Sequence, residues 1–246
     1  MGNGLPSLCM NEANNDTHPI GLIACSYEGA LLCYKSICLE AAALMGPHAH
    51  PTISMHNHSL RESMICIEQD DWKGVALLML DSAKKLVATG AELIACPDNT
   101  IHQALELLDE PLPGKFVHIA EEVMKEAQRC GYKKPALMGT KYLMEGPVYK
   151  KASANAGIPV SIPLQTDRVE INRIIFDELV HGIISPSSKA YLLQLIEQFK
   201  AQGCDAVILG CTEIPLIVLP EESALPVLDS TRLLAKALVH ASVAGD

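Results

Sequence analysis

Two short stretches of the chain place a cysteine at the end of an apolar run, with a carboxylate two positions further on. Residues 91–100 read AELIACPDNT, and residues 206–215 read AVILGCTEIP. A cysteine can give or take a proton, depending on its ionisation state. Two cysteines on opposite sides of one bound molecule could therefore remove a proton from one face and return a proton to the other. This pattern predicts general acid/base chemistry by Cys96 and Cys211.

The sequence around these stretches alternates between short apolar strands and helices. In the N-terminal half we expect strands at 20–26, 51–58 and 91–96, and helices at 28–45, 71–90 and 101–108. In the C-terminal half we expect strands at 134–140, 157–163 and 205–211, and helices at 171–184 and 187–203. Alternation of this kind predicts parallel sheets that are covered by helices on both faces.

Equal spacings suggest that one half of the chain duplicates the other. Ala24 and Gly139 are 115 positions apart, and so are Cys96 and Cys211. We therefore expect an α/β protein with two pseudo-symmetric, doubly wound parallel-sheet domains and the active site between them. The expected parts are a flexible N-terminal segment (1–18), a first domain carrying Cys96 (19–116 plus 217–246) and a second domain carrying Cys211 (117–216).

Polar residues follow the expected strands at the edge where doubly wound sheets bind ligands. The loops that would meet at this edge contain Ser26 and Tyr27, Cys96 to Thr100, Thr140, and Cys211 to Glu213. Asn99, Thr100 and Thr212 lie where a strand gives way to a helix. Their side chains and the free N–H groups of a helix start suit an anion such as a carboxylate.

Composition narrows the class of partner. Hydrophobic residues make up 49% of the 246 residues and the formal net charge is -10, without the basic patch that a nucleic-acid surface needs. No apolar run approaches the roughly 18–20 residues of a membrane helix. The nine cysteines form no C-x-x-C pair or disulfide framework, which favours a reducing cytoplasm. We therefore expect a cytoplasmic protein with a small-molecule partner, no nucleic acid and no membrane.

Several motifs resemble the cofactor-independent aspartate/glutamate racemase family, over nearly the whole chain from residue 19 onward. They are GCTEIP (210–215), CPDNT with His102 after it, LMGTKYLMEGPVYKK (137–151) and INRIIFDEL (171–179). The resemblance is to the aspartate racemase branch, because glutamate racemases usually carry histidine where Glu213 stands. It implies a two-domain α/β fold, commonly a homodimer, with no cofactor or metal and with Cys96 and Cys211 as the acid/base thiols.

The resemblance also implies the residues that bind substrate. The α-carboxylate and ammonium would be held by Asn99, Thr100, Thr140 and Thr212, with Ser26 and Tyr27 nearby. A carboxylate beside a thiol raises the thiol's pKa, so Asp98 and Glu213 are assigned positioning roles. Two departures stand out: CPDNT is longer than the usual spacing between the cysteine and Asn-Thr, and Glu170 stands where many aspartate racemases have a lysine. Arg61 and Arg168 are the expected replacements for binding a distal carboxylate.

The favoured substrate is aspartate, with several alternatives open. These are a glutamate or broader-specificity racemase, a maleate isomerase or hydantoin racemase of the same superfamily, and a dicarboxylate-binding sensor without turnover. His48, His50, His56 and His58 resemble a metal site, but no cysteine or acidic ligand joins them at a recognised spacing, so we expect no metal. His58 is a candidate for the pocket border, and Cys25 is interpreted as a packing residue.

Overall fold

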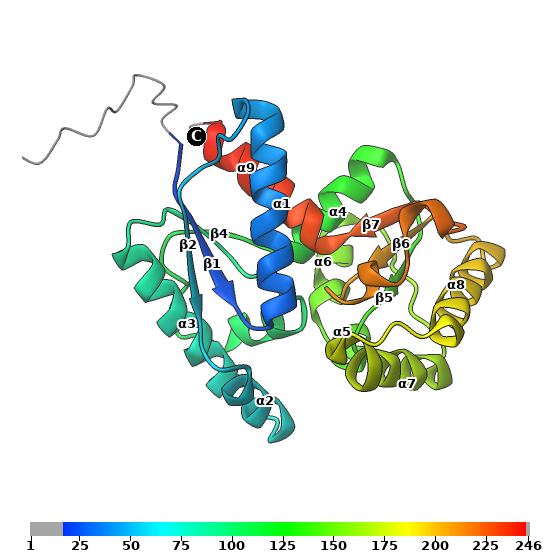
Figure 1. The fold of residues 1–246 in the computed structure, drawn as a ribbon. Helices are drawn as coiled ribbons and strands as arrows, with labels where there is room; N and C mark the ends of the chain where they lie inside the picture. The colour runs from blue at the N-terminus through cyan, green and yellow to red at the C-terminus, as the bar shows by residue number, and fades with distance from the viewer. Residues whose placement is uncertain (1–16, 245–246) are drawn as a thin grey trace, which may run out of the picture.

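The computed structural model describes residues 17–244, folded as two α/β halves side by side (Figure 1). The first half has a parallel sheet in the order β2-β1-β3-β4. Its strands are β1 (Ile20–Ala24), β2 (Ile53–Asn57), β3 (Leu93–Ala95) and β4 (Lys115–Val117). Its helices are α1 (Tyr27–Met45), α2 (Leu60–Glu68), α3 (Trp72–Ala88) and the 3₁₀ helix η1 (Thr100–Leu107). The expected α/β class with parallel strands is confirmed.

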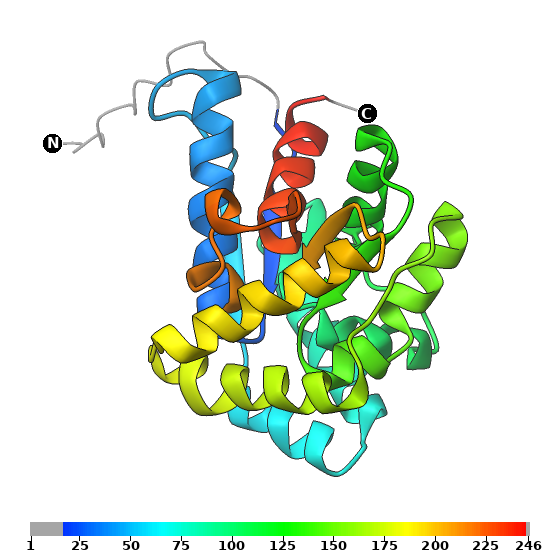
Figure 2. The same ribbon diagram turned by 90° about the vertical axis from the view of Figure 1, so that its right-hand side faces the viewer.

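The second half is built around a parallel sheet in the order β5-β6-β7. Its strands are β5 (Pro135–Met138), β6 (Ala206–Leu209) and β7 (Val227–Asp229). Its longer helices are α4 (Ile119–Cys130), α5 (Lys141–Glu145), α6 (Val148–Ala156), α7 (Gln165–Arg173) and α8 (Pro186–Ala201). Shorter turns are the π-helix η2 (Ile174–Glu178) and the 3₁₀ helices η3 (Leu179–His181), η4 (Ile214–Leu216) and η5 (Pro220–Glu222). Helix α8 (yellow in Figure 2) packs Leu192, Leu195 and Ile196 into the core of this half.

Two expected elements of the second half differ from the structure. The strand expected at 157–163 is reduced to one isolated bridge between Ser161 and Ala136. The helix expected at 171–184 begins earlier, at Gln165, and its α-helical part ends at Arg173, where the π-helix takes over. A π turn inserts an extra residue into the helical repeat, so the regular spacing of apolar residues does not reveal it.

The C-terminal segment is divided between the halves. We expected all of 217–246 in the first domain, but β7 pairs with β6 and so extends the second sheet. Helix α9 (Ser230–Val243) then returns and packs against α1 of the first half and α4 of the second (Figure 1). The expected flexible segment 1–18 lies outside the described residues except for positions 17 and 18. None of the helices in residues 17–244 is long and apolar enough to cross a membrane.

The first sheet buries both of its faces, and strand alternation decides which side chain enters which core. Ile20, Leu22 and Leu93 pack on the side of α1 and α9. Ile94 and Cys96 pack on the opposite side, against α3. The direction of the Cys96 side chain is therefore set by the strand that precedes it.

A buried chain of hydrogen bonds ties the loop after β3 to the second half. Asn99 donates from Nδ2 to Ser230 Oγ at 2.9 Å, and Ser230 Oγ donates to the Leu209 carbonyl at 2.9 Å. The Tyr149 hydroxyl donates to Asn99 Oδ1 at 3.1 Å. Because these groups are buried, each bond that is lost would leave a polar group without a partner.

We expect Tyr149→Phe to lower the free energy of unfolding by about 1–2 kcal/mol, because the side-chain oxygen of Asn99 loses its hydrogen-bond donor. In an Asn99→Ala background the same substitution should cost close to nothing, since the bond is already gone. Urea denaturation of the double-mutant cycle measures this coupling. Tyr34→Phe, at an exposed tyrosine, is the matched control, and additive effects of Tyr149→Phe and Asn99→Ala would contradict the expectation.

Candidate active site

A cavity of about 340 Å³ opens between the two halves, beyond the carboxyl ends of β1, β3, β5 and β6. Both halves contribute to its wall, as expected for ligand sites in doubly wound sheets. Most of the predicted site residues line it: Ser26, Tyr27, Asn99, Thr100, Thr140, Cys211, Thr212 and Glu213. Tyr27 also contacts the second half, because its hydroxyl donates to the Val180 carbonyl at 3.5 Å.

Hydroxyl groups and the start of a helix both contribute to the cavity wall. Ser26 caps α1 by accepting a hydrogen bond from the Gly29 N–H at 3.2 Å. The hydroxyls of Thr100 and Thr140, from opposite halves, hydrogen-bond to each other at 3.0 Å. The start of a long helix carries partial positive charge and free N–H groups. This part of the wall can therefore bind a carboxylate without a cationic side chain.

Cys211 lies at the cavity with its proton directed to a neighbouring carboxylate. Its thiol donates to Glu213 Oε2 at 2.8 Å, and the Thr212 hydroxyl donates to the same oxygen at 2.8 Å. Burial and the negative charge of Glu213 raise the pKa of the Cys211 thiol well above its usual value. Cys211 is thus a neutral thiol at neutral pH, which can give up a proton as a general acid.

Cys96, the other predicted thiol, is not part of the cavity wall. Its side chain is 0% exposed and lies in the core between the first sheet and α3. It points to the same side as Ile94, as the two-residue period of a strand requires. Cys96 donates to the backbone carbonyl of Asp98 at 3.8 Å. The structure therefore does not bring Cys96 and Cys211 together across the cavity.

Asp98 and Cys25 occupy the first-half wall instead. Burial, followed by the charge of Glu213, raises the pKa of the Asp98 carboxyl to about 6. Hydrogen bonds from the Thr100 and Ile101 N–H groups and from the Cys25 thiol act in the opposite direction. The interpretation of Cys25 as a packing residue was therefore incomplete. Its place directly before Ser26, at the exit of β1, is the signal that could have identified it.

Neither predicted arginine reaches the cavity. Helix α2 turns Leu60, Met64 and Ile67 toward it, and this i, i+4, i+7 spacing leaves the exposed Arg61 on another face. Arg168 is held elsewhere, because it donates to Glu145 Oε1 at 2.9 Å and to the Pro163 carbonyl at 2.8 Å. Within residues 17–244, neither arginine nor lysine contributes to the wall of this cavity.

The remaining wall is mainly apolar and was not identified from the sequence. From the second half it includes Ile175 and Phe176, on the π-helix η2, and Val180 on η3. π turns occur often at functional sites, and here one directs apolar side chains into the cavity. His181 adds an imidazole, and Glu28 adds a carboxylate to those of Asp98 and Glu213.

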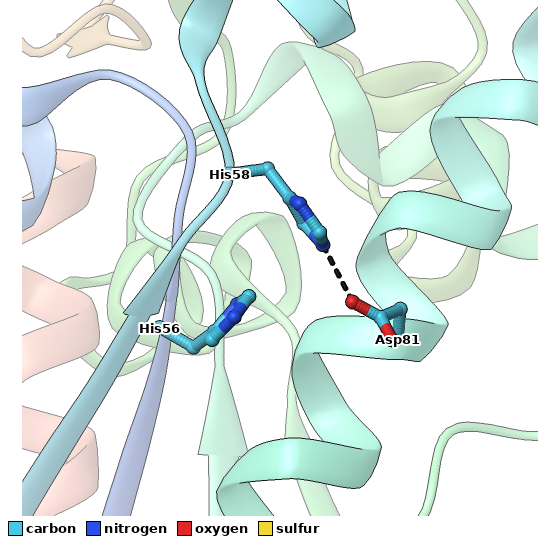
Figure 3. A group of neighbouring side chains, drawn as sticks. All are labelled: His56, His58 and Asp81. Carbon is cyan, nitrogen blue, oxygen red and sulfur yellow. Dashed lines mark hydrogen bonds and ion pairs between the residues drawn. The ribbon is translucent and has the colours of Figure 1, made fainter.

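A second polar cluster lies outside the cavity, where β2 exits toward α2 (Figure 3). His58 Nε2 lies 2.7 Å from Asp81 Oδ2, and the rings of His56 and His58 are 4.8 Å apart. These three residues could hold an ion by their spacing. Lys85 Nζ, however, lies 2.6 Å from the same carboxylate oxygen of Asp81 and already neutralises it. His58, a predicted border residue of the pocket, does not line the cavity.

Comparisons with known proteins agree with this fold. Residues 20–238 match the family model described as Asp/Glu/Hydantoin racemase. The chain is 28% identical over 181 residues to the broad specificity amino-acid racemase RacX of Bacillus subtilis (strain 168), which covers 72% of this chain and 75% of RacX. A crystal structure of an aspartate racemase homologue from Pyrococcus horikoshii OT3 superposes with a TM-score of 0.79 at 30% identity, covering 91% of this chain and 98% of that one.

A more distant structure, the aspartate racemase of Picrophilus torridus, has a TM-score of 0.72 at 18% identity, over 92% of this chain and 94% of that one. It supports the two-domain racemase fold. The chain belongs to the Asp/Glu/hydantoin racemase family and is a racemase, an isomerase that acts on small amino-acid substrates.

The raised pKa of Asp98 makes a prediction about stability. Protonated Asp98 stabilises the folded state below about pH 4, and this contribution is lost as the pH rises through about 6. We therefore expect Asp98→Asn to be more stable than wild type at pH 7.5, by up to about 3 kcal/mol. The difference in free energy of unfolding should shrink toward pH 4, as measured by urea denaturation.

Asp81→Asn is the control, because hydrogen bonding to Lys85 lowers the pKa of Asp81. Its stability change at pH 7.5 should have the opposite sign and be small at this exposed site. An Asp98→Asn variant that is less stable than wild type at pH 7.5 would contradict the assignment of a destabilised carboxylate.

Proposed function

We propose that this protein racemises free α-amino acids with uncharged side chains. The observation that carries the proposal is the composition of the cavity wall: apolar side chains and carboxylates line it, and among residues 17–244 no lysine or arginine does. A distal carboxylate on the substrate would enter a site that already holds Glu28, Asp98 and Glu213, and it would be repelled. An aliphatic side chain would instead bury apolar surface against α2 and the π-helix.

The proposed reaction begins with binding of the substrate carboxylate by neutral donors. The Thr100 and Thr140 hydroxyls would turn from each other toward the carboxylate, near the start of α1. Oriented donors of this kind stabilise the negative charge that develops on the carboxylate as the α-proton leaves. The substrate ammonium would lie near the carboxylates of the wall.

Proton transfer in racemisation requires groups on both faces of the α-carbon. Cys211 is the proposed group of the second half, because its thiol lines the cavity and is protonated at neutral pH. Removing one acid/base group typically costs about 10²–10⁴-fold in rate. The comparison with RacX, which is described as having broad amino-acid specificity, supports a substrate range wider than dicarboxylates.

Aspartate is the second candidate substrate. It is favoured by the likeness to the Pyrococcus horikoshii aspartate racemase homologue and by His181, whose imidazole lines the cavity. In this alternative, the His181 imidazole would donate a hydrogen bond to the distal carboxylate. His181→Ala should then raise the KM for aspartate while leaving the KM for an aliphatic amino acid unchanged.

A substrate panel tests the proposal. L-leucine, L-methionine, L-aspartate and L-glutamate are incubated with the protein without added cofactor, and both enantiomers are quantified by chiral chromatography. We expect kcat/KM to be at least about tenfold higher for leucine or methionine than for aspartate, a difference of about 1.4 kcal/mol.

The matched control is Cys211→Ala, which should lower the rate at least about 100-fold for every substrate turned over. Faster turnover of aspartate than of either aliphatic amino acid would favour the second candidate. Absence of turnover across the panel would contradict both.

A further inference from the structure

We propose that Asp98, in place of a second cysteine, is the acid/base residue that works opposite Cys211. This inference rests on the proposed function, because it names the second proton-transferring group which racemisation needs. Asp98 lines the cavity from the first half, and Cys211 lines it from the second. Cys96 is fully buried in the core of the first half, does not line the cavity, and donates from its thiol to the Asp98 carbonyl.

Buried side chains hold the backbone of Asp98 in place. The His102 ring donates from Nδ1 to the Asp98 carbonyl at 2.8 Å, and the Cys96 thiol donates weakly to the same carbonyl. The Thr100 N–H donates to Asp98 Oδ1 at 3.0 Å. Three contacts within a few residues thus fix both the main chain and one carboxylate oxygen. The Ile101 N–H and the Cys25 thiol also donate to the Asp98 carboxylate, and Asp98 lines the cavity.

The groups around Asp98 give the pair complementary protonation states. Glu213 faces Asp98 from the second half, while the thiols of Cys25 and Cys211 and the N–H groups of η1 complete its surroundings. With a pKa of about 6, Asp98 is mainly ionised at neutral pH, whereas Cys211 keeps its proton. One residue is therefore poised as a base and the other as an acid, as a two-base reaction requires.

The proton transfers balance within this pair. An Asp98 oxygen takes the α-proton as the Cα–H bond breaks, and the electron pair of that bond moves into the substrate carboxylate. The S–H bond of Cys211 then breaks with its electron pair left on sulfur, and the proton bonds to the opposite face of Cα as the electron pair held in the carboxylate returns to Cα. The pair ends as a carboxylic acid and a thiolate, and proton exchange with water restores the starting state. The same pair, with its proton on Asp98, serves the opposite enantiomer.

Cys25 is the competing candidate for the first-half wall, since its thiol also lines the cavity. Burial and the charge of Asp98 raise the pKa of the Cys25 thiol well above its usual value. A thiol that donates to Asp98 stabilises the carboxylate and is itself hard to ionise. Cys25 is therefore a positioning residue for Asp98 and not the base.

Three variants separate these assignments: Asp98→Asn, Cys96→Ala and Cys25→Ala. Racemisation of the preferred panel substrate should fall at least about 100-fold in Asp98→Asn and stay within about tenfold of wild type in Cys96→Ala. Thermal unfolding checks that each variant is folded, and Cys96→Ser replaces Cys96→Ala if the latter does not fold. His102 still holds the Asp98 carbonyl in either Cys96 variant.

The pH profile of kcat/KM is the second measurement. For wild type, kcat/KM should rise as the pH increases through about 6. The reason is that Asp98 and Cys211 must together hold one proton, and not two, in both directions of the reaction. In Cys25→Ala the carboxylate loses a donor, so this rise should move to higher pH while activity remains above that of Asp98→Asn. A purely structural Asp98 would not give such a shift.

The outcomes distinguish the two proposals. Wild-type protein without racemase activity on the panel would overturn the proposed function. If wild type is active, either of two results overturns the Asp98 assignment alone. One is that Asp98→Asn keeps its activity within about tenfold of wild type. The other is that Cys25→Ala or a folded Cys96 variant loses as much activity as Asp98→Asn. A wild-type profile that is flat between about pH 5 and 8 would also overturn it.

Discussion

The side-chain amide of Asn99 is the contact on which the arrangement of the site depends. It joins the loop after β3 to Tyr149 and Ser230 of the second half through buried hydrogen bonds. An amide supplies a donor and an acceptor at once, so one side chain satisfies a partner on each side. With position 99 fixed, the preceding residue is held at the cavity and Thr100 is placed against Thr140. The two halves are therefore aligned at the candidate active site.

This alignment produces a site whose charges come from acids and from helix starts. Three carboxylates line a small cavity together with an apolar wall. Burial, together with the charges of Asp98 and Glu213, raises the pKa of the Cys25 and Cys211 thiols. The effect is to keep Cys211 protonated and to bring Asp98 into the range where a carboxyl can both take and release a proton near neutral pH. In the proposed reaction the substrate carboxylate is bound by hydroxyls and N–H groups, so that no cationic side chain is needed beside the acid/base pair.

Much of the fold and part of the site could be predicted from the sequence. Apolar runs that end in polar residues identified β1, β3, β5 and β6, and the residues just after them identified Thr100, Thr140 and Thr212 as cavity residues. β4 and β7 were missed because neither lies in a continuous apolar run like the one that contains β3, and their places in the sheets depend on long-range pairing. The apolar wall was missed because α2 was not recognised and a π turn leaves no periodic signal. Arg61 and Arg168 were misplaced because the facing of a helix is set by tertiary contacts.

The duplicated cysteine pattern that first suggested the chemistry is offset by one residue from the duplicated structure. The ends of the strands, Ala24 and Met138 in one pair and Ala95 and Leu209 in the other, are each 114 positions apart. The two cysteines are 115 apart, so Cys96 directly follows its strand while Cys211 stands one position further on. In an extended chain a shift of one residue reverses the direction of the side chain. Cys96 consequently enters the core, and the longer CPDNT turn carries a carboxylate to the wall that faces Cys211.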